Sequence, residues 1–206
     1  MQAGTAIDAN WEFRLTMEET ARADPEYLWI RQIAEGDRDA FEKLYHAYQA
    51  RLFRYLYRMV NDISTAEELT NDVMVAAWKA AASFRGQSKP STWLFGIAHY
   101  KALNELRGKR PQIVEIENAG QVVAAGEDPE AAVSRQSLQQ SIQRVLQELS
   151  PEHREVVELT FYQGLSYQEI AEIMQCPVNT VKTRMFYAKQ RLQGALKGKG
   201  ITGETQ

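Results

Sequence analysis

Apolar residues recur at helical spacing through most of the chain. In the clearest stretch, from about residue 39 to residue 61, apolar positions follow one another at intervals of three, four and one. These positions are Phe41, Leu44, Tyr45, Tyr48, Leu52, Tyr55, Leu56 and Met59. Such a stripe is typical of an amphipathic helix that packs one face against a core. A different, alternating pattern between Trp11 and Met17 fits a strand and a disordered tail equally well.

Start and stop signals predict three further helices in the first half of the chain. The residues Asp-Pro-Glu at 24–26 are suited to the beginning of a short helix, which Gly36 would end. A capping-box pattern at 64–67 predicts the start of a longer helix. After a break at 84–89, a fourth helix is expected from Pro90 to Gly108. These four helices would form one domain.

A change in composition separates this domain from the rest of the chain. Residues 111–133 contain proline, glycine and five acidic residues but no basic one, which predicts a flexible acidic linker. Further start and stop signals predict helices at about 128–149, 150–162, 167–174 and 178–197. The predicted fold is therefore all-α, with two small helical domains that move independently. Its parts are an N-terminal extension (1–27), a first domain (28–110), the linker (111–133), a second domain (134–197) and a tail (198–206).

Composition narrows the class of protein. Apolar residues make up 44% and charged residues 25% of the 206 positions, as in folded soluble domains rather than disordered chains. No stretch approaches the roughly 20 consecutive apolar residues of a membrane span, and the first residues lack the pattern of a signal peptide. We therefore expect a cytoplasmic protein. With one cysteine, Cys176, and three scattered histidines, we expect no disulfide, metal site or cofactor.

The distribution of charge changes this picture. The net charge of −3 hides basic segments at 28–110 and 134–206, separated by the acidic linker. Between Ile173 and Gly203 every charged residue is basic. This asymmetry indicates that the C-terminal end binds a polyanion.

The basic end also has the pattern of a helix-turn-helix, formed by 167–174 and 178–197. Ile170 and Ile173 are placed for a core, and Ala171 is small enough to face the partner helix. In such a unit the second helix lies in the DNA major groove with its first turns against base edges. The residues predicted to contact DNA there are Asn179, Thr180, Lys182, Thr183, Arg184, Lys189 and Arg191. The alternative is an ordinary helical hairpin with a solvated basic face.

Two regions resemble the extracytoplasmic-function (ECF) group of bacterial RNA polymerase sigma factors. Leu-Ser-Tyr-Gln-Glu-Ile-Ala at 165–171 and Cys-Pro-Val-Asn-Thr-Val-Lys-Thr-Arg at 176–184 resemble the promoter-binding domain of that group. Residues 66–78 and 84–98 resemble its polymerase-binding helix and its promoter-melting segment, in the same order. One departure is Gln175, which stands where the family often has glycine. If this residue is left-handed, we expect about 1 kcal/mol of strain.

The resemblance implies an alternative sigma factor that binds core RNA polymerase, recognises minus-ten and minus-35 promoter elements and helps to melt DNA. The implied partners are promoter DNA, the coiled coil of the largest polymerase subunit, the flap of the second-largest subunit and an anti-sigma factor. The implied polymerase-binding residues are Leu69, Asp72, Val73, Val75 and Trp78. The implied minus-ten and melting residues are Phe84, Arg85, Gln87, Ser88, Lys89, Ser91, Thr92, Lys101, Asn104 and Arg107.

Catalysis has no support in the sequence. There is no pairing of a nucleophile with a base and no glycine-rich phosphate loop, so we expect neither an enzyme nor a small-molecule substrate. The second hypothesis is a transcriptional regulator with a helical sensing domain, which would lack the motifs at 66–98. The third is a helical hydrolase or nucleotidyltransferase with a DNA-binding domain, which would need a catalytic cluster.

Overall fold

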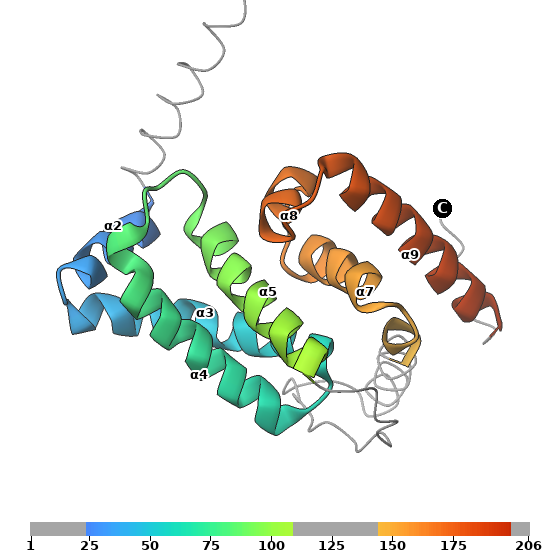
Figure 1. The fold of residues 1–206 in the computed structure, drawn as a ribbon, viewed down its shortest axis with the longest axis horizontal. Coiled ribbons are helices and arrows are strands. Elements are labelled where there is room, and N and C mark those ends of the chain that lie inside the picture. Colours follow the sequence, from blue (N-terminus) through green and yellow to red (C-terminus); the bar gives the residue numbers. More distant parts are fainter. Residues whose placement is uncertain (1–23, 109–143, 199–206) are drawn as a thin grey trace, which may run out of the picture.

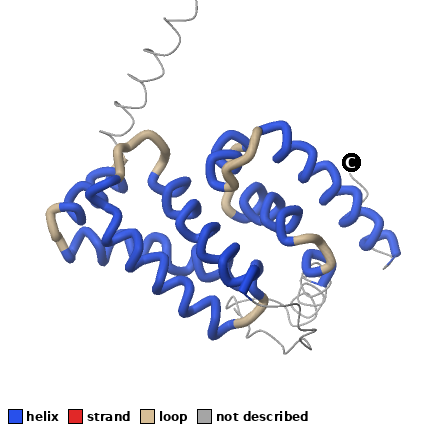
Figure 2. The backbone as a smooth tube through the Cα atoms, in the orientation of Figure 1, coloured by secondary structure: helices blue, strands red, loops and turns tan. Residues whose placement is uncertain are grey.

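The computed structural model describes residues 24–108 and 144–198, and every regular element in these ranges is helical (Figures 1 and 2). The first domain comprises α2 (Pro25–Ala34), α3 (Arg38–Val60), α4 (Ile63–Ala80), the short η1 (Ala81–Ser83) and α5 (Pro90–Gly108). The second comprises α7 (Pro151–Val157), the π-helical turn η2 (Glu158–Tyr162), α8 (Tyr167–Ile173) and α9 (Val178–Gly198), preceded by helical residues at 144–147. The prediction of an all-α fold is confirmed. The linker, the tail from 199 and the alternating pattern at 11–17 lie outside the described residues.

Short polar side chains set where the first helices begin. The Asp37 carboxylate caps α3 by accepting hydrogen bonds from the backbone N–H groups of Asp39 and Ala40, at 2.9 and 3.1 Å. The predicted start of α4 at Ser64 is wrong. Asp62 is the capping residue, and its Oδ1 accepts from the N–H of Thr65 at 2.7 Å. The side chains of Asp62 and Ser64 both carry an oxygen that could cap a helix, but only Asp62 has the extended backbone of a capping position.

The core of the first domain is built around α3, whose Leu44, Tyr48, Leu52, Tyr55 and Leu56 are almost completely buried. The ring of Phe95 from α5 packs edge-on against the ring of Tyr55, with centroids 5.4 Å apart. From α4, the expected Leu69, Val73 and Ala77 are buried. Ala76 and Ala80, also expected to face inward, are only half-buried, whereas Ala66, Thr70 and Met74 take buried positions.

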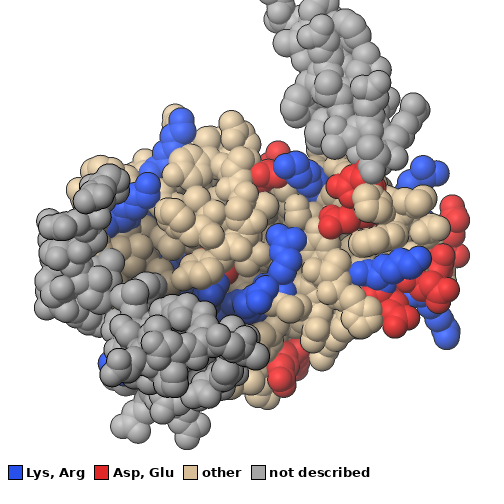
Figure 3. Space-filling view, turned by 180° about the vertical axis from the view of Figure 1, so that it is seen from behind, with Lys and Arg blue, Asp and Glu red and all other residues tan. Residues whose placement is uncertain are grey.

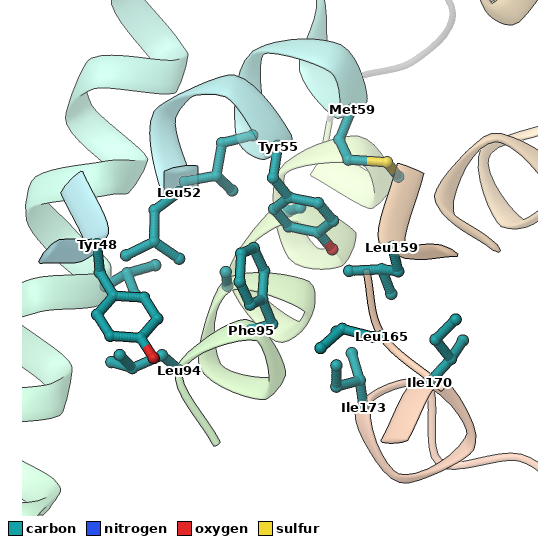
Figure 4. Packing of buried hydrophobic residues seen from close by; sticks show 14 of the residues in the cluster. Tyr48, Leu52, Tyr55, Met59, Leu94, Phe95, Leu159, Leu165, Ile170 and Ile173 are labelled. Carbon is teal, nitrogen blue, oxygen red and sulfur yellow. The ribbon is translucent and has the colours of Figure 1, made fainter. Parts of the chain in front are cut away.

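The two domains pack against each other, which differs from the independent movement predicted from the linker. Helix α5 lies along α8, and α3 contacts α7 and η2 (Figure 1). Figure 4 shows Phe95 of the first domain on the side that faces Leu165 and Ile173 of the second. These residues belong to one continuous cluster of buried apolar side chains. Within the described ranges, no helix is long and apolar enough to cross a membrane.

Arg154 of α7 joins the domains through backbone carbonyl groups. Its guanidinium is buried and donates to the carbonyl oxygens of Arg58 and Met59 at the end of α3, both at 3.2 Å. It also donates to those of Leu146, Gln147 and Leu149 in the second domain, at 3.0 to 3.2 Å. All five N–H donors of the side chain are therefore used. Burial lowers the pKa of Arg154, but these acceptors lie at helix C-termini, which favour a cation.

Candidate nucleic-acid interface

The helix-turn-helix predicted from the sequence is present, and its first helix is fixed by a reciprocal cap. The hydroxyl of Ser166 accepts from the N–H of Glu169 at 3.3 Å, and the Glu169 carboxylate accepts from the N–H of Ser166 at 2.8 Å. This confirms the capping box at the start of α8. Ile170 and Ile173 are buried between the helices, as predicted, and Val181 of α9 is buried with them.

Because the capping box satisfies two backbone donors, Ser166→Ala should lower the free energy of unfolding by about 1 kcal/mol. Urea unfolding followed by circular dichroism measures this change. Ser64→Ala is the matched control, since Asp62 and not Ser64 caps α4, and we expect a change below about 0.5 kcal/mol. Equal losses in the two variants would contradict both assignments.

The turn between α8 and α9 contains a left-handed residue. Gln175 has φ +47°, so the left-handed conformation considered above is present. The turn is closed by the N–H of Cys176, which donates to the carbonyl of Ala171 at 3.1 Å. A side chain in this conformation costs about 1–2 kcal/mol, which glycine would avoid. The packing of α8 and α9 therefore holds a strained residue in place.

One face of α9 carries exposed polar side chains at helical spacing. The predicted DNA contacts that are exposed on this helix are Asn179, Lys182, Thr183, Lys189 and Arg191. Thr180 is half-buried. In the view from behind, most visible acidic side chains lie on the first domain rather than on the second (Figure 3). A helix with this exposed face can enter a major groove and reach bases and phosphates.

Arg184 lies differently from the other predicted contacts on α9. It is half-buried, and its guanidinium is 3.8 Å from the sulfur of Cys176 and 4.0 Å from that of Met174. The pKa of Glu152 is lowered by its backbone hydrogen bond and, to a smaller extent, by Arg184. In this arrangement Arg184 supports the turn and faces the first domain.

An aromatic cluster packs against the loop at 84–89. The rings of Phe84 and Trp93 are 4.9 Å apart, and that of Tyr27 is 5.9 Å from Phe84. The Tyr27 hydroxyl also donates to the carbonyl of Ser88 at 3.2 Å. Gly86 has φ +67°, and a β-carbon there would lie 3.7 Å from the Tyr27 ring. Tyr27 thus positions the loop, although the sequence placed it in the N-terminal extension. The only sequence signal for this residue was its position next to the predicted start of α2.

The polar residues of this loop and of α5 differ in their solvent exposure. Arg85, Gln87 and Lys89 are exposed, as are Asn104 and Arg107, while Ser88 and Ser91 are half-buried. Thr92 is buried, and its hydroxyl has no hydrogen-bond partner among the described residues. It therefore cannot touch DNA in this conformation.

The residues of α4 that are predicted to bind polymerase differ in their exposure. Val75 is 50% exposed and Asp72 is exposed, so both can meet a partner. Val73 is fully buried and Leu69 nearly so, which gives them a core role in this conformation. Trp78 packs edge-on against Phe41, with centroids 5.1 Å apart. Asp72 also forms an ion pair with Lys101 at 2.8 Å, which joins two predicted sites.

An aromatic surface that was not predicted from the sequence lies on the second domain. Phe161, Phe186 and Tyr187 are each more than half exposed, and the Lys189 ammonium lies 6.0 Å from the Phe161 ring centroid. Two adjacent aromatic residues in the middle of a basic helix were the available signal. Among the described residues, no group of His, Cys, Asp or Glu side chains is placed to hold a metal ion.

Comparisons with known proteins agree with this geometry. The sigma-70 region 2 family model matches residues 44–112, and the sigma-70 region 4 model matches residues 139–192. The chain is 32% identical over 177 residues to RNA polymerase sigma-H factor of Pseudomonas aeruginosa, covering 82% of this chain and 92% of that protein. It is 33% identical over 177 residues to ECF RNA polymerase sigma factor SigW of Bacillus subtilis, covering 82% and 95%.

Two solved structures share the fold. The chain matches CnrH, solved in complex with the cytosolic domain of CnrY, with a TM-score of 0.66 and 23% identity over 85% of this chain and 99% of that one. It matches the sigma factor RpoE of Bartonella quintana, solved in complex with the anti-sigma factor NepR, with a TM-score of 0.61 and 26% identity over 76% and 96%. Since the sequence relatives are matched over nearly their whole length and both domains occur in the same order, the chain belongs to the ECF family of RNA polymerase sigma factors.

Proposed function

We propose that this sigma factor divides promoter recognition between its domains, with residues 28–110 on core polymerase and the minus-ten element and residues 134–197 on the minus-35 element. The observation that carries this proposal is the exposed polar face of α9 in a domain of the region 4 family. Asn179, Lys182 and Thr183 lie in its first turns, where a recognition helix reads bases. Lys189 and Arg191 lie farther along and meet phosphate.

The loop at 84–89 would act after the duplex opens. Separated bases lose their stacking energy, and polar side chains on a rigid loop can bind the exposed base edges. Arg85 and Gln87 are exposed on such a loop, above the aromatic cluster that includes Tyr27. The adjacent side chains of Asn104 and Arg107 on α5 would follow the DNA backbone.

Two surfaces would contact polymerase. The exposed Asp72 and Val75 on α4 would meet the coiled coil of the largest subunit. The surface formed by Phe161, Phe186 and Tyr187 would meet the flap of the second-largest subunit, since exposed aromatic clusters mark protein contacts.

We further propose that an anti-sigma factor controls this chain in the cytoplasm. The support is the similarity to RpoE, which was solved with the anti-sigma factor NepR. The absence of a catalytic constellation from the sequence supports a role in transcription rather than catalysis.

Transcription with purified core polymerase tests the proposal, using the full chain and a template carrying a cognate promoter. We expect initiation that depends on both protein and promoter. Val75→Asp should weaken capture of core polymerase about tenfold or more, because it places a charge in an apolar contact. Leu28→Asp is the matched control, since Leu28 is equally exposed on α2, away from the proposed contact. Equal losses, or initiation without promoter dependence, would contradict the assignment.

A further inference from the structure

The residues of the loop at 84–89 alternate between an inner and an outer row. The outer row is exposed and consists of Arg85, Gln87 and Lys89. The residues between them are half-buried, and these are Phe84, Gly86 and Ser88. The loop therefore turns polar side chains to the solvent at every second position.

All three residues of the inner row contact the side chain of Tyr27. The centroid of the Phe84 ring lies 5.9 Å from that of the Tyr27 ring. A β-carbon on Gly86 would lie 3.7 Å from the same ring. The carbonyl oxygen of Ser88 accepts a hydrogen bond from the Tyr27 hydroxyl at 3.2 Å. One side chain therefore supports the loop along most of its length.

The loop depends on such contacts because its own backbone has no regular structure. Between the end of η1 at Ser83 and the start of α5 at Pro90, the chain forms neither helix nor strand. Gly86 has φ +67°, a conformation that glycine adopts at no steric cost. A segment of this kind has many accessible conformations unless outside contacts select one. The contacts with Tyr27 therefore help to decide which side chains form the outer row.

Tyr27 is itself held in a fixed place. It is 6% exposed and lies in the first turn of α2. The Asp24 carboxylate caps this turn by accepting from the N–H of Glu26 at 2.9 Å, and the Tyr48 hydroxyl of α3 donates to the Glu26 carboxylate. Helix α2 also packs against η1, the turn that leads into the loop. Tyr27 thus connects the loop to the helical core.

The Tyr27 hydroxyl remains a hydrogen-bond donor near neutral pH. Burial raises the pKa of Tyr27, and the carboxylates of Asp24 and Glu26 raise it further. The phenol therefore stays protonated, and its hydrogen bond to Ser88 does not depend on pH in this range.

We propose that Tyr27 is a positioning residue for promoter opening, which holds the loop so that Arg85 and Gln87 are already placed to receive unpaired bases. This inference rests on the proposed function of the loop. A binding loop that is ordered in advance binds more tightly, because the cost of ordering it is not incurred on binding. Opening should gain from this order, whereas contacts of α9 with the minus-35 element should not.

Tyr27→Phe tests the proposal, because it removes the hydroxyl and keeps the ring against Phe84 and Gly86. The variant is assembled with core polymerase on a promoter from which the parent chain initiates. We expect the amount of closed complex formed in the cold to be unchanged. The open fraction, measured by the permanganate reactivity of unpaired thymines, should fall about fivefold, the factor that corresponds to one ordinary hydrogen bond.

Trypsin digestion of the free full-length chain measures the loop without DNA. Trypsin cleaves after Arg85, whereas the bond after Lys89 resists cleavage because Pro90 follows it. We expect Tyr27→Phe to be cleaved after Arg85 about fivefold faster than the parent, since a loop that has lost this hydrogen bond opens more often.

Tyr48→Phe is the matched control. It removes the same atom from a buried tyrosine whose hydroxyl donates to Glu26 of α2 and not to the loop. We expect this variant to match the parent in open fraction and in cleavage after Arg85. The proposal is overturned if Tyr27→Phe opens the promoter as well as the parent does, or if Tyr48→Phe shows an equal loss. A parent that initiates at no promoter would instead overturn the proposed function and, with it, the role of Tyr27 in opening. The cleavage rates distinguish that case, because they report the state of the loop alone.

Discussion

Replacing Arg154 with alanine is expected to lower the free energy of unfolding by about 3 to 4 kcal/mol. The change removes five hydrogen bonds from a charged donor and leaves carbonyl groups of two helix ends with no buried partner. Hydrogen bonds to charged groups contribute about 1.5–3 kcal/mol each, but the freed carbonyls recover part of this by meeting water. Urea unfolding measures the loss.

Arg154→Lys is the informative companion to this variant. Lysine keeps the positive charge near the two helix C-termini but has three donors in place of a planar set of five. We therefore expect an intermediate loss, of about 1 to 2 kcal/mol. A loss below about 1 kcal/mol in Arg154→Ala would mean that water replaces the guanidinium at these carbonyls.

Arg184→Ala and Lys189→Ala are expected to change DNA binding in different ways, one in sequence preference and the other in overall affinity. If Arg184 reads a base in the complex with DNA, its loss costs about 1–3 kcal/mol at the cognate minus-35 element and relaxes the preference at one position. Lys189 is exposed farther along α9, so its loss should weaken all sequences alike and reduce the salt dependence by about one ion. Affinities for cognate and singly substituted duplexes at several salt concentrations separate the two.

The position of Arg184 beside Cys176 and Met174 supplies the competing outcome. If the side chain only supports the turn, Arg184→Ala should lower the free energy of unfolding and weaken binding to every duplex by the same factor. Unfolding measured on the same samples distinguishes this result from a loss of base reading. Uniform weakening without loss of stability would instead place Arg184 on phosphate.

Most, but not all, of the helix starts could be predicted from local sequence signals. Asp24 and Ser166 act as caps where the sequence indicated helix starts, because capping depends on a side chain and on backbone groups two or three residues away. Asp37, which was predicted only as part of the preceding stop, caps α3. At α4 the sequence pattern predicted a cap at Ser64, but the capping residue lies two positions earlier, at Asp62. Asp62 caps the helix because its backbone is extended, and it directly follows Asn61, which ends α3 in a left-handed conformation with φ +56°.

For some of the predicted site residues the sequence also gave the correct exposure, and for others it did not. Periodicity and charge were enough to place Lys182, Thr183 and Lys189 on the exposed face of α9, since that face is opposite the buried Val181 and Met185. Val73 and Thr92 followed from family motifs, and both are buried. A motif gives the residue but not the direction of its side chain, which depends on what packs around the helix.

The sequence by itself determined the all-α class, the two domains, the helix-turn-helix and the family, because spacing, capping and motifs are local properties of the chain. The tertiary structure alone decided that the domains close on each other. The contacts responsible join residues about 100 positions apart, such as Tyr55 with Glu155 and Arg58 with Glu158. In the local sequence, nothing distinguishes these residues from ordinary positions in a helix. Only packing removes water from the carboxylates and makes their pairing with the first domain strong enough to matter.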